Sequence, residues 1–101
     1  MNLSMLNQAR QLKSKLDEAQ KELSKTVVEA ESGKGAVKVT VNGQQKLLSI
    51  KISPEVIDPN KPKHLEELIL KAISGATAKS QKLAEKHLAK LTGGLKIPGL
   101  M

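Results

Sequence analysis

Alternating aliphatic and polar residues on both sides of one Asn-Gly pair constrain the fold of this chain most. Alternation gathers aliphatic side chains on one face of a strand, and Asn-Gly favours the tight turn of a hairpin. The aliphatic positions before and after the pair are Val37, Val39, Val41, Leu48, Ile50 and Ile52. The pattern therefore predicts a β-hairpin with one apolar face.

The pattern leaves two hairpin registers open. A turn centred between residues 42 and 43 pairs Val37 with Leu48, and a turn centred between residues 43 and 44 pairs Val37 with Ile50. Both registers keep the aliphatic residues on one face. A β-branched segment, TVVEAES, and a turn-forming GKG precede the hairpin. We therefore expect a three-stranded antiparallel meander whose polar face carries Lys38 and Lys51.

Helical periodicity flanks the strands on both sides. Apolar residues recur every three or four positions at Met5, Ala9, Leu12, Leu16, Ala19 and Leu23. This heptad seam predicts a helix from about Leu3 to Lys25, suited to packing against another helix. After the proline-containing loop SPEVIDPNKP, a second helix is expected from about Lys63 to Leu91, where Gly93-Gly94 would end it.

The second helix has an apolar sector beside a basic one. At 100° per residue, the apolar sector contains Leu65, Ile69, Ala72, Ile73, Ala76, Leu83, His87 and Leu91. The neighbouring basic sector contains Lys71, Lys79, Lys82 and Lys86, and Lys90 lies at the border between the two sectors. We call these five lysines the lysine rail. A lysine-rich helix face can be merely solvated or can bind an anionic partner. From residue 68 to 101 there are six lysines and one acid, an imbalance that favours binding.

Composition limits the classes of function. The 101 residues suit one domain, residues 1–101, with an apolar tail, 95–101, that either folds back or stays mobile. The absence of Phe, Tyr and Trp leaves a modest aliphatic core, for which dimerisation would be a natural supplement. The chain has no cysteine, and we find neither a signal peptide nor a membrane span in the sequence, so we expect a cytoplasmic protein.

The sequence contains no pattern typical of a catalytic or metal-binding site. His64 and His87 match no metal-ligand spacing, and His87 is expected to be a packed, hydrogen-bonded side chain. The SGKG segment lacks the remainder of a phosphate-binding loop. Adjacent Glu66 and Glu67 point about 100° apart on a helix and would not flank one substrate atom. We expect no enzyme activity, cofactor, metal or small-molecule substrate.

The chain contains, in order, the heptad helix and the segments ESGKGAVKVTVNG, IKISPEVID, HLEELILKAI and LAKLTGGLKIPGL. Together these resemble the YbaB/EbfC family of bacterial nucleoid-associated proteins over nearly the whole chain. The resemblance implies an α+β protomer, with two long helices flanking a three-stranded antiparallel sheet, assembled as a tweezer-like homodimer that binds DNA on the nucleoid. The chain departs from the family at Ser74-Gly75, where members commonly have Asn-Asp.

A net charge of +7 and the resemblance together favour double-stranded DNA as the partner. Without aromatic side chains, bases of single strands cannot be stacked. The lysine rail would contact phosphates, and Asn7, Arg10 and Gln11 on the first helix would supply any direct readout. We expect weak or modest selectivity. The alternative is a protein-interaction adapter that uses the heptad seam and the apolar tail.

Overall fold

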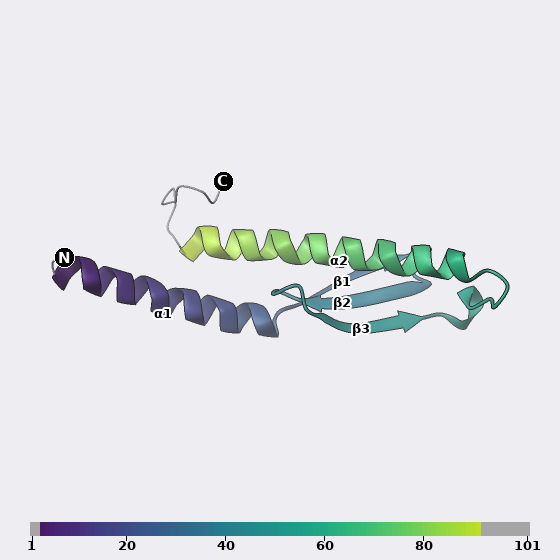
Figure 1. Ribbon diagram of the computed structural model, residues 1–101, viewed down its shortest axis with the longest axis horizontal. Coiled ribbons are helices and arrows are strands. Elements are labelled where there is room, and N and C mark those ends of the chain that lie inside the picture. Colours follow the sequence, from purple (N-terminus) through teal and green to yellow (C-terminus); the bar gives the residue numbers. More distant parts are fainter. Residues whose placement is uncertain (1–2, 92–101) are drawn as a thin grey trace.

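The computed structural model describes residues 3–91 and confirms the predicted α+β fold. Its elements are α1 (Leu3–Lys25), β1 (Val27–Ser32), β2 (Val37–Asn42), β3 (Leu47–Ile52), the short 3-10 helix η1 (Pro54–Val56) and α2 (Pro62–Leu91). The molecule is elongated, 67 × 23 × 18 Å, with α1 and α2 extending from one end of the sheet (Figure 1). The tail, 95–101, lies outside the described residues.

The three strands form one antiparallel sheet in the order β1-β2-β3, as the meander predicts. Helix α2 covers one face of the sheet, where it packs on β1 and β2 and hardly touches β3 (Figure 1). The core between sheet and helix is small and aliphatic: Ala30, Val37, Val39, Val41, Leu68, Ala72 and Ala76. The alternation of β2 therefore faces α2, whereas most of β3 remains exposed.

Both predicted hairpin registers are wrong, because Val37 pairs with Ile52 and Val39 with Ile50. The connection is longer than a two-residue turn and comprises residues 43–46. The Asn42 side chain stabilises it, since Oδ1 accepts hydrogen bonds from the backbone N–H groups of residues 44 and 46 at 2.9 and 3.0 Å. The observed register differs from the predicted ones by an even number of positions, so alternation could not distinguish them.

The hairpin loop joins both helices to the sheet. The Gly43 N–H donates to the carbonyl of Leu23 in α1 at 2.8 Å. On the other side, Ser80 in α2 donates from Oγ to the Asn42 carbonyl at 2.6 Å and accepts from Gln45 Nε2 at 3.1 Å. We call these five residues the hairpin junction. It fixes where α1 and α2 leave the sheet.

Helix α2 is rotated on the sheet relative to the predicted apolar sector. Its buried residues are Leu68, Ala72, Ala76 and Ser80. Leu68 lies outside the arc of that sector, on its lysine side, and Ser80 lies within the arc although it is not apolar. Gly75 lies on the same side of α2 as Leu68, and a Cβ atom placed there would lie 3.4 Å from the Ala30 Cβ, so this side of α2 approaches β1 closely. The sector's other members, Ile69 and Ile73 among them, are half-buried.

Candidate nucleic-acid interface

The lysine rail occupies an exposed side of α2. All five lysines are exposed, as predicted. They span positions 71 to 90, which corresponds to about 28 Å along the helix axis at 1.5 Å per residue, within an arc of about 100°. The rail is therefore a long, narrow basic surface on a rigid element.

Acidic side chains do not neutralise the rail. Within residues 3–91 the one contact under 4.0 Å between an acidic and a basic side chain joins Glu22 Oε2 and His87 Nε2 at 3.0 Å, and it involves no lysine. Lys79 alone among the rail lysines donates a hydrogen bond in this part of the chain, from Nζ to the backbone carbonyl of Glu29 at 2.8 Å. This bond places the Lys79 ammonium beside the free edge of β1. The other four ammonium groups face solvent.

Three polar residues on α1 form a separate exposed group. Asn7, Arg10 and Gln11 are all exposed and lie on the side of α1 opposite the heptad seam. The N-terminal half of α1, purple in Figure 1, projects beyond the end of α2. The structure thus leaves these residues accessible on one helix and the rail on another, and no recorded hydrogen bond or ion pair joins the two groups.

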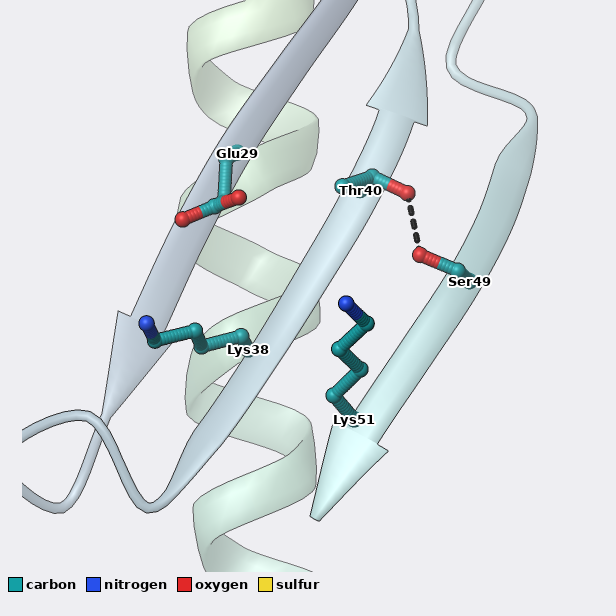
Figure 2. Close-up of a pocket in the computed structure, with 5 residues that line it drawn as sticks. All are labelled: Glu29, Lys38, Thr40, Ser49 and Lys51. Atoms are coloured by element: carbon teal, nitrogen blue, oxygen red, sulfur yellow. Dashed lines mark hydrogen bonds between the residues drawn. The ribbon is translucent and has the colours of Figure 1, made fainter. Parts of the chain in front are cut away.

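The outer face of the sheet carries a polar cluster. Its residues were not among the binding residues predicted from the sequence. This face has an open hollow of about 230 Å³, and Figure 2 shows the side chains that line it. Its lining residues come from all three strands: Glu29, Lys38, Thr40, Ser49 and Lys51. The only sequence signal for the cluster was the polar half of the strand alternation, which placed Lys38 and Lys51 on one face.

Aliphatic side chains gather in exposed groups on β3 and on the N-terminal half of α1, while Val27, Ile57 and Leu70 are exposed elsewhere. On β3, Leu47, Leu48 and Ile50 are 44%, 47% and 40% exposed. In the N-terminal half of α1, the exposed aliphatic residues are Leu3, Met5, Leu6 and Leu12. The heptad seam is thus buried within the chain only at its C-terminal end, at Ala19 and Leu23.

Other kinds of site are not evident in the described region. Among residues 3–91, no three His, Asp or Glu side chains gather closely enough to hold a metal ion. None of the helices in this range has the length and apolar character needed to cross a bilayer. His87 is half-buried and contacts Glu22, in agreement with a packed, hydrogen-bonded histidine.

Comparison with known proteins gives consistent matches along the chain. Residues 1–95 match the model of the YbaB/EbfC DNA-binding family. A nucleoid-associated protein of Chloroflexus aggregans is 45% identical over 92 residues, which cover 91% of this chain and 92% of the relative. A nucleoid-associated protein of Myxococcus xanthus is 44% identical over 95 residues, 94% of this chain and 90% of the relative.

The fold also has a match among solved structures. A crystal structure of the uncharacterized protein HP0035 from Helicobacter pylori superposes with a TM-score of 0.79, covering 93% of this chain and 99% of that chain. Its sequence identity is 20%, so the likeness concerns the arrangement of helices and strands alone.

Proposed function

This chain belongs to the YbaB/EbfC DNA-binding family, and from that premise we propose that it binds double-stranded DNA as a homodimer, mainly through contacts between lysines and phosphates. The observation that carries the proposal is the lysine rail, which is exposed and free of ion pairs within the described residues. Relatives named as nucleoid-associated proteins support a place on the cytoplasmic nucleoid. The family is a DNA-binding family, in agreement with the prediction that the chain is not an enzyme.

The chemistry of the rail favours affinity over sequence selectivity. Lysine ammonium groups are point charges that attract phosphate oxygens, and phosphate contacts position a protein on DNA without reading its bases. Arg10 is the single arginine of the chain, so each protomer can form at most one bidentate guanine contact. With Asn7 and Gln11 beside it, Arg10 would supply what direct readout there is. We therefore propose weak or modest selectivity.

The proposed homodimer is supported by the exposed aliphatic surfaces. The core contains only small or medium aliphatic side chains, while Leu48 and Ile50 on β3 are 47% and 40% exposed. Because α2 hardly touches β3, these side chains are left uncovered by the helices within residues 3–91. Pairing two protomers through this surface would remove them from water, which stabilises an interface by roughly 25 cal/mol per Å² of apolar area. A dimer would also present two rails to one duplex.

A triple substitution tests the role of the rail. Lys82, Lys86 and Lys90 should be replaced by Gln, because they lack the bond to β1 that Lys79 makes. We expect affinity to fall by a similar factor for unrelated duplexes, since the lost contacts are to phosphates. Gel shifts at fixed salt measure this. The matched control replaces Lys34, Lys61 and Lys63, which are also exposed but lie in the turn between β1 and β2 and around the first residue of α2, far along that helix from Lys82, Lys86 and Lys90. If both variants lost the same affinity for duplex DNA, the rail would contribute only through the net charge of the protein.

Replacing Arg10 separates base readout from phosphate attraction. Arg10→Ala should compress the affinity differences among duplexes, by up to about 1–3 kcal/mol at a contacted base pair. Arg10→Lys keeps the charge but loses the bidentate geometry, so it should relax selectivity while retaining more affinity. Competition gel shifts with a panel of duplexes measure both effects. A selectivity profile that neither variant changes would exclude Arg10 from readout.

A protein-interaction adapter is the second candidate function, favoured by the exposed N-terminal half of the heptad seam. Leu12 there is 41% exposed and Met5 61% exposed. If this candidate is correct, a variant that lacks residues 95–101 and has a polar residue in place of Leu12 should lose a specific protein complex. The same variant should still bind duplex DNA. Loss of duplex binding in the Lys82, Lys86 and Lys90 variant with an unchanged protein complex would favour the DNA-binding function instead.

A further inference from the structure

The outer face of the sheet has a charge arrangement that the fold itself does not require. Helix α2 lies behind the sheet in Figure 2, and the strands present their polar side chains on the opposite, open side. Lys38 in β2 lies directly opposite Lys51 in β3 in the strand register. Like charges in directly opposed positions of an antiparallel pair destabilise a sheet. The pair thus lowers the free energy of unfolding, which is small in proteins of any kind.

Neighbouring groups do not offset this repulsion fully. Glu31 lies opposite Lys38 on its other side, in β1, whereas Lys51 lies on the edge strand and has no further strand beside it. Neither lysine forms an ion pair within 4.0 Å or a recorded hydrogen bond among residues 3–91. In Figure 2 the two side chains diverge, with Lys51 directed toward Thr40 and Ser49. An anion between them would attract both ammonium groups.

Two hydroxyl groups complete the chemistry of an oxyanion site. Thr40 Oγ1 and Ser49 Oγ share a hydrogen bond across β2 and β3 (Figure 2). One hydroxyl donates in that bond, so the accepting hydroxyl keeps its own proton for another partner. The hollow that these side chains line measures about 230 Å³ and is open to solvent. Ammonium and hydroxyl donors around such a hollow suit the non-bridging oxygens of a phosphate group.

We propose that this cluster, the sheet-face site, binds a backbone phosphate of a second DNA segment, so that one protein joins two duplexes. This inference rests on the proposed duplex binding by the lysine rail. The rail lies on α2 and the sheet-face site on the opposite side of the sheet, and the molecule is only 23 × 18 Å across. Duplex DNA has a persistence length of about 150 base pairs, so one segment does not bend around so thin a body to reach both surfaces.

The carboxylate of Glu29 borders the hollow on β1 and would repel a phosphate there. The phosphate therefore lies toward β3, between Lys51 and the hydroxyl pair. Two kinds of substitution should therefore have opposite effects on binding at the sheet-face site. Removing the lysine charges should weaken it, and removing the Glu29 charge should strengthen it. Because the Glu29 backbone carbonyl, not its side chain, accepts the bond from Lys79, Glu29→Gln leaves the rail intact.

The experiment captures one duplex on another. A biotinylated duplex is immobilised, the full chain is bound, and the retention of a second, fluorescent duplex of unrelated sequence is measured. The wild type should retain the second duplex. The double variant Lys38→Gln, Lys51→Gln should bind the immobilised duplex within about twofold of the wild type but retain the second about tenfold more weakly, as expected for the loss of one charge-assisted contact from Lys51 and of the longer-range attraction of Lys38. Glu29→Gln should retain more than the wild type.

Each outcome bears on one hypothesis. Retention of the second duplex by the double variant at the wild-type level would overturn the sheet-face site, because the rails of a dimer would then suffice for joining duplexes. A wild type that binds the first duplex and retains no second one would overturn it as well. A wild type that fails to bind the first duplex would overturn the proposed function itself. Lys38→Arg, Lys51→Arg keeps both charges, so restored retention in this variant supports the site and excludes misfolding as the cause of loss.

Discussion

At the scale of single residues, Gly43 shows how one motif can serve a different purpose from the one its sequence suggests. Asn42-Gly43 predicts a two-residue hairpin turn, yet the loop is longer and Gly43 is buried against the end of α1. A Cβ atom at Gly43 would lie 2.6 Å from the Leu23 carbonyl oxygen, well inside van der Waals contact. The glycine is thus needed because α1 approaches the backbone closely, and the alternation of the strands carries no sign of this.

Alanine at two glycines should therefore have opposite effects. Gly43→Ala should lower the free energy of unfolding by about 1–3 kcal/mol, because α1 must move away from the hairpin junction. Gly75→Ala meets the Ala30 Cβ at 3.4 Å, an ordinary contact, and gains up to about 1 kcal/mol of helix propensity. Urea denaturation of both variants measures the difference. A Gly43→Ala protein as stable as the wild type would show that α1 is not held as the structure has it.

At the scale of elements, periodicity and β-branched composition predicted both long helices and the three strands, but not the short helix η1 or how the elements pack on one another. Alternation in β2 and β3 indicates which side chains share a face, and α2 covers that face only over β1 and β2. Helix α2 lies close to Ala30 in β1 and leaves β3 exposed, an arrangement that alternation alone does not specify. The lysine rail was predictable because lysine side chains are seldom buried, whereas the sheet-face site depends on a register that alternation left open.

The exposed strand β3 leads to a prediction about assembly. Leu48→Ser should weaken the homodimer by about tenfold in its dissociation constant, as for an apolar contact worth about 1–2 kcal/mol at an interface. Val27→Ser is the matched control, since Val27 is 57% exposed on β1, the opposite edge of the sheet. Sedimentation equilibrium measures both constants. A monomeric wild type, or equal weakening in the two variants, would exclude β3 from the dimer interface.

At the scale of the whole molecule, charge and shape together suggest how DNA is held. The chain carries +7, and a dimer would carry twice this charge on two elongated protomers. Lys79 is held to β1, so the four rail lysines left for phosphates are Lys71, Lys82, Lys86 and Lys90. A dimer would then neutralise about eight phosphates and release their counterions. Each neutralised phosphate contributes roughly −0.9 to the slope of log affinity against log salt.

The salt dependence of duplex affinity tests this account most directly. Equilibrium binding to a single duplex, measured by fluorescence anisotropy from low to moderate salt, should give a plot of log affinity against log salt with a slope near about −7. The Lys82, Lys86 and Lys90 variant should have a shallower slope, by about 1 for each lysine removed from each protomer. A wild-type slope close to zero would contradict the account, because binding would then release few counterions and the lysine rail would be only a solvated surface.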